Sequence, residues 1–489
     1  MKTPAPVLRI LLFTSEECKF CPEVDRIVRK HVGNQRFVNV TPIDVNLNPD
    51  IAERFSVIRL PTVVINNQRV LEGYMSEEDI RDRLWNILFQ NILARDPALE
   101  KRRESVFALT HNMVQSASQK KLIRRNIGDY VHLGALQIAN MSLLALDRLA
   151  SHLIYDAARM QGLYGPAQLM LTTSNPSIFQ QIKVANRFRA AIQGIVRLMS
   201  DHTQFPVYTA ERAEVRELTD STALVRVYGS AYAVGAPTLG EPLCWSLAGE
   251  VAGQIQSVVG RPARVTETAC HGLGQTWCEF FVELVSEEEA TAVGSDEKGQ
   301  TQERRIVFQT TLMEMSEQHQ NSLFLKSKMR PQVGDFVHIA EIQGVVTAIK
   351  LMDPFCGMLL YSAGSVFGLT GPGKHLLQEE LGEDKVMGSL SLEEAVRLVV
   401  WELKHPTTQL SRQHSFVRFE VVSEERAVVV IKENYFSAGT PDVGETFCDF
   451  TAGFLRGRLQ LLVEDDVLVS EVSCVGSGGD DCRFEIALD

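Results

Sequence analysis

Hydrophobic and polar positions in the first 95 residues alternate in a way that predicts a small, complete α/β domain. Apolar runs of strand length are separated by amphipathic stretches of helical period, and Ser76 stands where the last helix would need its N-cap. A tight turn at Asn66 and Asn67 would close a hairpin. The predicted order is β-α-β-α-β-β-α over residues 8–15, 21–32, 36–46, 48–57, 61–73 (both hairpin strands) and 76–93.

The remaining hydrophobic pattern occurs twice. "GDYVHLGALQ" at 128–137 matches "GDFVHIAEIQ" at 334–343, and "GAPTLGEPLC" at 235–244 matches "GTPDVGETFC" at 439–448. Each unit is predicted to hold a strand, several helices, a β-hairpin, a further helix and a final strand pair. The sequence therefore predicts an internal duplication within an α/β (α+β) multidomain chain.

Length and composition divide the chain further. With 489 residues, 45% hydrophobic and 22% charged, it resembles an ordinary globular protein of about three domains. The charged stretch at 96–126 and the polar, glycine-containing stretch at 286–319 are expected to connect the parts. The predicted domains are 1–95, 127–285 and 320–489.

Charge and hydropathy exclude two kinds of partner. A net charge of −12 without a dense basic stripe argues against nucleic acid. No apolar window is long enough for a membrane span, and residues 1–19 do not form a convincing signal peptide. We therefore expect a cytoplasmic protein, in which nine cysteines need a reason other than structural disulfides.

Six of these cysteines fall in register in the two repeats, each set with a glutamate three residues before its middle cysteine. Three soft thiolates and one carboxylate form a complete tetrahedral ligand set for a structural Zn²⁺ ion. Buried free thiols or a redox disulfide are the alternatives. The predicted ligands of two zinc ions are Cys244, Glu267, Cys270 and Cys278, and Cys448, Glu471, Cys474 and Cys482.

The phrases "ETACHGLGQTWCEF" and "EVSCVGSGGDDCRF" resemble the 4-vinyl reductase-type domain, which phenol-responsive activators use as a sensor and which is related in fold to subunits of the TRAPP tethering complex. The resemblance implies a zinc-containing fold that dimerises around an apolar pocket. Two copies in one chain could pair as an intramolecular pseudo-dimer, or the chain could form a homodimer. In place of the tryptophan and histidine that hold phenol, these repeats carry Ala223, Ala427, Ile195 and Val399, so a more apolar small ligand, or none, is expected.

A second cysteine motif, "SEECKFCPEV", places Cys18 and Cys21 between the first strand and the first helix. Together with "RLPTVVI", in which Pro61 holds the place of a cis proline, the motif resembles the thioredoxin and glutaredoxin-like fold. The resemblance implies thiol–disulfide exchange with a client protein, with Cys18 as the attacking thiolate and Cys21 as the resolving thiol. A metal site or a docking module remains the alternative for this pair.

Two functions of different classes follow. The first is a thiol–disulfide oxidoreductase-like protein joined to tandem zinc-stabilised domains that bind a small molecule. The second is a non-catalytic adaptor or scaffold that uses the thioredoxin fold and TRAPP-like repeats to bind proteins. Reduction of a vinyl group is a third, weaker hypothesis, because no nicotinamide or flavin fingerprint is present.

Overall fold

The computed structural model describes most of the three predicted domains. Outside the described residues lie the turn at 66–67, the end of the helix predicted at 76–93, most of the connector at 96–126 and most of the linker at 286–319. The described residues are 8–32, 38–65, 68–77, 79–81, 83–84, 122–147, 149–163, 183–203, 207–286, 307–308, 310–312, 314–315, 318–319, 328–352, 356–371, 373–382, 387–405 and 412–488.

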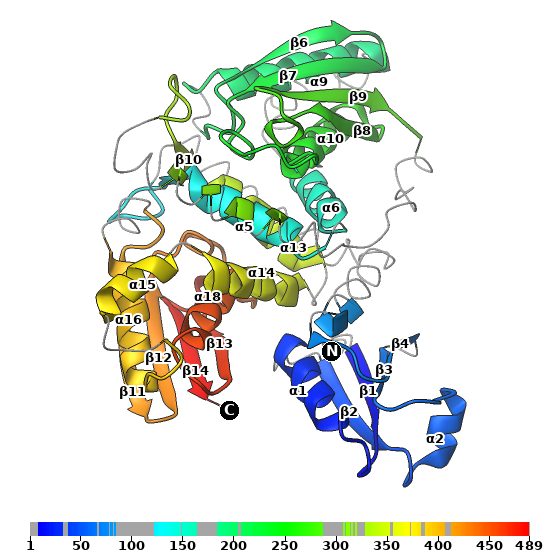
Figure 1. The fold of residues 1–489 in the computed structure, drawn as a ribbon. Coiled ribbons are helices and arrows are strands. Elements are labelled where there is room, and N and C mark those ends of the chain that lie inside the picture. Colours follow the sequence, from blue (N-terminus) through cyan, green and yellow to red (C-terminus); the bar gives the residue numbers. More distant parts are fainter. Residues whose placement is uncertain are drawn as a thin grey trace.

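The N-terminal domain is built on a four-stranded sheet with the order β2-β1-β3-β4 (Figure 1). Strand β1 pairs in parallel with β2 and antiparallel with β3, which pairs antiparallel with β4. The predicted β-α-β-α-β-β order is confirmed over the elements β1 (Leu8–Thr14), α1 (Cys21–Val32), β2 (Val38–Asp44), α2 (Pro49–Arg54), β3 (Thr62–Ile65) and β4 (Gln68–Glu72).

Strand β1 is predominantly apolar because both of its faces are covered. Ile10 and Leu12 lie in one core with Ile27 of α1, whereas Phe13 lies in a second core with Ala52 of α2. The closing segment begins as predicted, since the backbone N–H of Asp79 donates to the Ser76 hydroxyl at 3.2 Å.

The duplication is visible in the elements that follow. The first repeat contains β5 (Tyr130–His132), α5 (Leu133–Leu144), α6 (Ala150–Leu163), α9 (Val184–Ser200), β6 (Arg212–Leu218), β7 (Thr222–Tyr228), α10 (Trp245–Val259), β8 (Ala263–Ala269), η1 (His271–Leu273) and β9 (Cys278–Leu284). The second contains β10 (Phe336–His338), α13 (Ile339–Met352), α14 (Cys356–Thr370), α15 (Gly373–Leu381), α16 (Leu392–Lys404), β11 (Phe416–Ser423), β12 (Arg426–Lys432), α18 (Asp449–Gln460), β13 (Val467–Ser473), η2 (Val475–Ser477) and β14 (Cys482–Leu488).

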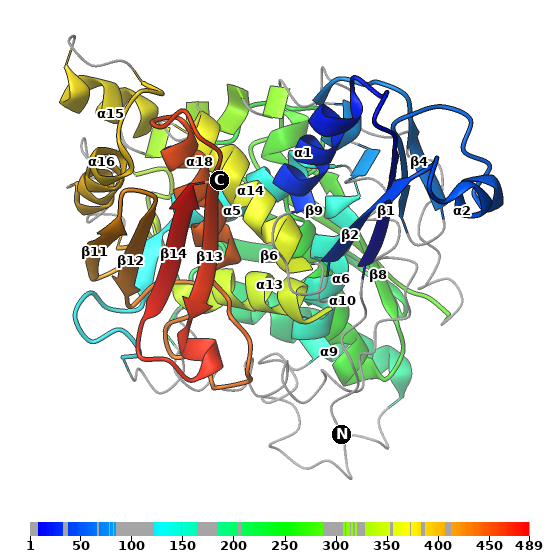
Figure 2. The ribbon, with the colours of Figure 1, turned by 90° about the horizontal axis from the view of Figure 1, so that it is seen from below.

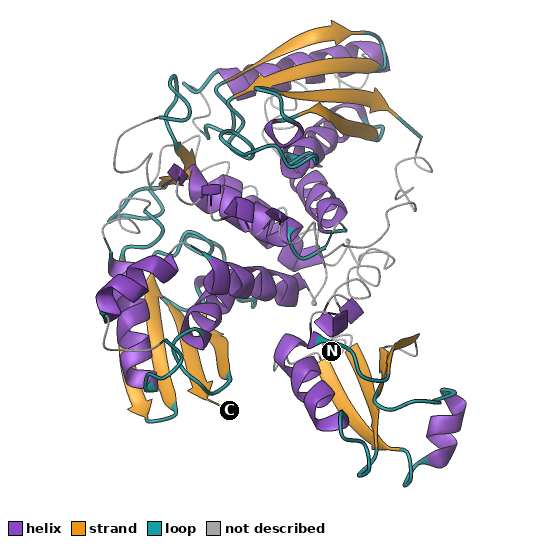
Figure 3. Ribbon diagram, in the orientation of Figure 1, coloured by secondary structure: helices purple, strands orange, loops and turns teal. Residues whose placement is uncertain are grey.

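Each repeat has an antiparallel four-stranded sheet with the same topology. The orders are β6-β7-β9-β8 and β11-β12-β14-β13; the second sheet is seen in Figure 2. Helices α10 and α18 pack against their own sheets and against α6 and α14, respectively (Figure 3). These helix pairs approach closely at glycines: a Cβ on Gly249 would collide with the Tyr155 carbonyl oxygen, and one on Gly453 with that of Tyr361.

The two repeats meet through a short antiparallel sheet made by one strand from each. Val131 of β5 pairs with Val337 of β10, and these residues occupy equivalent positions in the duplication. Two buried arginines bridge the repeats reciprocally: Arg124 donates to the Arg412 carbonyl oxygen at 2.6 Å, and Arg330 to that of Tyr208 at 2.5 Å. The repeats are therefore related by a pseudo-twofold axis through the β5–β10 ribbon.

The paired histidines at the ends of these strands have a structural role, as the sequence suggested. The Nδ1 atoms of His132 and His338 accept from the backbone N–H groups of Gly134 and Ala340, both at 3.2 Å, at the starts of α5 and α13. Within the described part of the chain, no helix combines the length and apolar character needed to cross a membrane.

Candidate redox pair and metal centres

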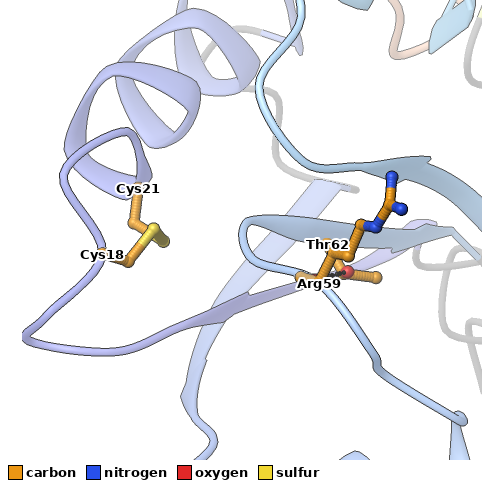
Figure 4. The surroundings of a disulfide bond; sticks show 4 residues. All are labelled: Cys18, Cys21, Arg59 and Thr62. Atoms are coloured by element: carbon orange, nitrogen blue, oxygen red, sulfur yellow. Dashed lines mark hydrogen bonds between the residues drawn. A yellow bond between two sulfur atoms is a disulfide. The ribbon is translucent and has the colours of Figure 1, made fainter.

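Cys18 and Cys21 form a disulfide where the loop after β1 enters α1 (Figure 4). Their Cα atoms are 5.5 Å apart, and the N–H of Cys21, the first helical residue, donates to the Cys18 carbonyl oxygen at 3.3 Å. Cys18 is partly exposed, whereas Cys21 is 4% exposed. An incoming thiol or disulfide can therefore reach Cys18 but not Cys21.

The segment that carries Pro61 lies across from this disulfide. The Leu60–Pro61 peptide bond is cis, and the Pro61 carbonyl oxygen accepts from the N–H of Gly73 at 2.8 Å. The Thr62 hydroxyl donates to the Arg59 carbonyl oxygen, which closes the loop before β3. Figure 4 shows the segment from Arg59 to Thr62 facing the cysteine pair.

Two exposed aromatic side chains flank the redox pair. Phe20, between the two cysteines, is 47% exposed, and its ring centroid lies 4.5 Å from that of Tyr74, which is 51% exposed. Neighbouring aromatic residues left in solvent favour contact with an apolar partner. The sequence analysis missed this pair; the signal available was an aromatic residue inside the C-x-x-C motif.

The first metal-ligand cluster gathers residues from three separate elements. Cys244 is the N-cap residue of α10, Cys270 follows β8, and Cys278 begins β9. Strand β8 is bulged between Glu267 and Ala269. In a regular strand, residues three apart face opposite sides, but one extra residue in a bulge restores them to the same side. The bulge therefore explains how Glu267 and Cys270 point to one centre.

The ligand atoms of each cluster lie close together. One atom from each of the four residues falls within 4.8 Å of the others, in both repeats. The Sγ atoms of Cys244 and Cys278 are 3.3 Å apart, and those of Cys278 and Cys270 are 3.9 Å apart. The structure brings together the eight residues that the sequence grouped. In the described part of the chain, no other group of three or more His, Cys, Asp or Glu side chains has this geometry.

The glutamates are held with one oxygen in use and one available. Oε2 of Glu267 accepts from the N–H of Cys244, and Oε2 of Glu471 from that of Cys448, both at 2.9 Å. The Oε1 atoms of both glutamates are buried and have no hydrogen-bond partner. Orphaned buried carboxylate oxygens are costly unless a cation occupies the centre.

Electrostatics point to the same requirement. Hydrogen bonds from Cys244 and Cys278 lower the pKa of Cys270 to about 2, so this thiol is the one that ionises. Burial raises the pKa of Cys244 and that of Glu267 well above their ordinary values. Burial and mutual repulsion thus oppose ionisation of all four ligands in the absence of a positive ion.

The donor set fits a divalent metal ion. For a tetrahedral ion with metal–sulfur bonds of about 2.3 Å, neighbouring sulfurs would be about 3.8 Å apart. The distances in the second cluster bracket this value, with Cys448 Sγ at 3.2 Å from Cys482 Sγ and 4.0 Å from Cys474 Sγ. Three sulfurs and one carboxylate oxygen complete four-coordination and leave no position for a substrate.

The second cluster differs from the first in its surroundings. The Lys350 ammonium of α13 lies 2.6 Å from the carboxylate of Asp449, the residue after Cys448, and both side chains are about nine-tenths buried. In the first repeat, Leu144 and Trp245 stand at the matching positions. No local sequence pattern signals this ion pair, because its partners are 99 residues apart.

The other singled-out residues lie in the hydrophobic interior. Cys356 is fully buried at the start of α14, and Ala223, Ala427, Ile195 and Val399 are buried in the core. No side chain at these four places could hold a phenol hydroxyl.

Comparison with known proteins assigns the domains. The thioredoxin-domain family matches residues 8–84, and the 4-vinyl reductase-type domain family matches residues 224–284 and 427–488. A thioredoxin of Methanocaldococcus jannaschii is 36% identical over 73 residues, which are 14% of this chain and 85% of that protein. A probable thioredoxin of Archaeoglobus fulgidus is 31% identical over 72 residues, 14% of this chain and 78% of that protein.

Other relatives match only in part. An uncharacterised protein of M. jannaschii is 34% identical over 77 residues, 16% of this chain, and the match spans 48% of that protein; a second spans 39%. The phenol-responsive sensory domain of the activator PoxR aligns with 16% identity and a TM-score of 0.23, over 32% of this chain and 75% of that domain. The chain belongs to the thioredoxin family through its N-terminal domain and carries two 4-vinyl reductase-type domains after it.

Proposed function

We propose that this protein is a thiol–disulfide oxidoreductase whose redox domain is coupled to two zinc-stabilised, small-molecule-binding domains. The observation that carries the proposal is the pairing of a partly exposed Cys18 with a buried Cys21, opposite a cis-proline segment, in a domain of the thioredoxin family. That arrangement suits one accessible nucleophile and one internal resolving thiol.

The exchange uses only residues of this domain and the client. In the reduced protein, the Cys18 thiolate attacks a client disulfide, forms a mixed disulfide and releases one client thiolate. The Cys21 thiolate then attacks Sγ of Cys18, which closes the Cys18–Cys21 disulfide and releases the second client thiolate. Two electrons pass from the protein to the client, and the released thiolates take up protons. The backbone beside Pro61 would align an extended client segment.

In this proposal, Zn²⁺ is the ion held by the four-residue cluster of each repeat. Cys244, Cys270 and Cys278 would supply thiolates and Glu267 its orphaned Oε1, with the matching residues doing the same in the second repeat. A closed four-ligand site pins strand pair to helix and contributes folding free energy, but it activates no water.

The two 4-vinyl reductase-type repeats would supply the sensing half of the protein. We propose the domain limits 1–95, 127–285 and 320–489, with a small, largely apolar ligand bound by the repeats as its class of effector. The β5–β10 pairing supports an intramolecular pseudo-dimer as the arrangement of the two sensors. A cytoplasmic location suits the exchange, because a reducing compartment regenerates the dithiol.

A scaffold function is the second candidate. The exposed Phe20–Tyr74 pair would suit stable docking of a protein as well as transient contact with a redox client. The two functions differ in whether Cys18 is needed.

Trapping of a mixed disulfide tests the proposal directly. With a dithiol as reductant, the wild-type chain should reduce insulin disulfides, and Cys18→Ser should abolish this activity. Cys21→Ser should accumulate a covalent adduct with the client, whereas Cys356→Ser, a change at a buried cysteine outside the motif, should behave as wild type. Equal reduction by wild type and Cys18→Ser would overturn the redox function, and client binding that survives in Cys18→Ser/Cys21→Ser would favour the scaffold.

A further inference from the structure

A small cavity lies where the first repeat meets helix α13 of the second. It has a volume of about 40 Å³. Ile195, Leu198 and Met199 of α9 and Leu247 of α10 form its apolar wall. Glu250 and Gln254 of α10, together with Glu341 of α13, form its polar wall. A space of this size holds one or two water-sized groups, such as the head group of a small ligand.

The polar wall presents hydrogen-bond acceptors rather than donors. Oε1 of Glu250 accepts from the Gln254 amide at 2.7 Å, and Oε2 of Glu341 accepts from the Tyr232 hydroxyl at 3.1 Å. Burial and the neighbouring Glu341 raise the pKa of Glu250 to about 8, while burial raises that of Glu341 to about 6. Near neutral pH the two carboxyl groups therefore hold about one negative charge between them.

An independent observation indicates that a donor is missing. Gln254 is only 4% exposed, and its Oε1 atom, on the cavity wall, has no hydrogen-bond partner. Because its amide nitrogen already donates to Glu250, this oxygen can only accept. A buried acceptor of this kind costs about 1 to 3 kcal/mol unless an occupant supplies an N–H or O–H group.

The nearest named cation is committed elsewhere. Arg330 acts on Glu341 electrostatically, but its guanidinium donates to the backbone carbonyls of Gly334, Phe336 and Tyr208. It moderates the charge of Glu341 and leaves the Gln254 oxygen unsatisfied.

The second repeat provides an internal comparison. By the duplication, Glu250, Tyr232 and Glu341 correspond to Phe454, Phe436 and Ala135, which are apolar. Gln254 corresponds to Arg458, whose guanidinium donates to Glu402 at 3.1 Å. The matching interior thus contains its own cation and no acid pair. The acceptor-lined cavity is a specific feature of the first repeat.

We infer that this cavity binds the ammonium group of a small primary amine. The three N–H donors of an alkylammonium would reach the two carboxyl groups and the Gln254 oxygen, and a short alkyl chain would contact the α9 wall. This inference rests on the proposed small-molecule-binding function of the 4-vinyl reductase-type repeats and names the ligand class for the first of them. Since Glu341 comes from the second repeat, the amine would also tie the two repeats together.

Calorimetric titration of the full chain in phosphate buffer at pH 7 tests the inference, with ethylammonium chloride as the probe. One ethylammonium should bind per chain. Ethanol, which is similar in size and uncharged, should not bind measurably, and neither should potassium chloride. Glu250→Gln and Glu341→Gln should each weaken binding about tenfold or more, because each removes a charge-assisted hydrogen bond. Glu425→Gln, at an exposed turn, is the matched control and should bind as wild type.

A second variant covers the case in which these substitutions disturb folding. Gln254→Arg brings in the residue of the second repeat and its own guanidinium, so it should abolish ethylammonium binding while raising the melting temperature. Equal binding of ethanol and ethylammonium, a response to potassium alone, or no binding at millimolar amine would each overturn the inference. None of these outcomes would affect Cys18-dependent insulin reduction, so failure here is distinguishable from failure of the redox function.

Discussion

Cys18 and the cysteines of the two metal-ligand clusters carry the same thiol group in opposite surroundings. Cys18 is partly exposed at a helix start, with one cysteine partner and with exposed aromatic rings beside it. Each cluster cysteine is at most 1% exposed and lies among two other sulfurs and a carboxylate. Access and the number of neighbouring ligands, rather than the thiol itself, separate exchange chemistry from metal binding.

The comparison is broken most severely by removing the exposed thiol. Cys18→Ser should reduce the rate of client disulfide reduction by more than about a hundredfold, because no other cysteine of the described domains is open to attack. Its melting temperature should stay close to that of wild type. Insulin turbidity and calorimetry measure the two effects.

Removing one buried thiol should have the reverse profile. Cys474→Ser should lower the metal content from two ions to one per chain and destabilise the second repeat by several kcal/mol, because metal binding and folding are coupled. Redox activity should persist in the variant. Elemental analysis and urea unfolding test this, and Cys270→Ser should give the same loss from the other repeat. Retention of both ions in either variant would remove that cysteine from the ligand set.

The ion pair beside the second cluster sharpens the comparison between repeats. Lys350→Met should destabilise the protein by about 3 to 5 kcal/mol, because it leaves Asp449 charged and buried without its partner. The double variant Lys350→Met/Asp449→Asn should recover most of that loss. Leu144→Met, at the matching position of the first repeat, is the control and should cost less than about 1.5 kcal/mol. Urea unfolding that places the single and double variants at the same stability would contradict this account.

The smallest effect concerns the inter-repeat ribbon. Burial lowers the pKa of His132 and that of His338 to about 4, compared with 6.5 in an exposed histidine. Between these values the unfolded chain binds more protons than the folded chain, so stability falls as the pH drops from 6.5 towards 4. Each histidine should contribute a loss of roughly 1 to 2 kcal/mol at about pH 5.

Substitution isolates this contribution. His132→Asn keeps an N-cap acceptor for α5 but removes the titrating ring, so the difference in unfolding free energy between about pH 7 and about pH 5 should shrink. An unchanged pH dependence in this variant would show that the ring does not titrate between these values in the folded or unfolded chain.

Local sequence patterns predicted the parts of the molecule that depend on period and spacing. The element order of residues 8–84 and the register of the repeats follow from hydrophobic alternation and from the repeated phrases. The E-x-x-C spacing pointed to a ligand set, although the bulge that turns Glu267 and Cys270 to one side is visible only in the strand pairing.

Long-range juxtaposition accounts for what sequence could not predict. Lys350 meets Asp449, and Glu341 meets Glu250, only once α13 has packed against elements that are distant in the sequence. A charged residue in a buried helix face was the available signal at each position, but it does not name its partner. Phe20 and Tyr74 likewise come together through the hairpin that follows Pro61.

Zinc content of the wild-type chain and of Cys18→Ser/Cys21→Ser, measured by elemental analysis after purification in a dithiol, tests the division between the two kinds of cysteine most directly. The account predicts two zinc ions per chain in both proteins, with client reduction only in the wild type. Absence of zinc from the folded wild-type chain, or loss of an ion in the double variant, would contradict it.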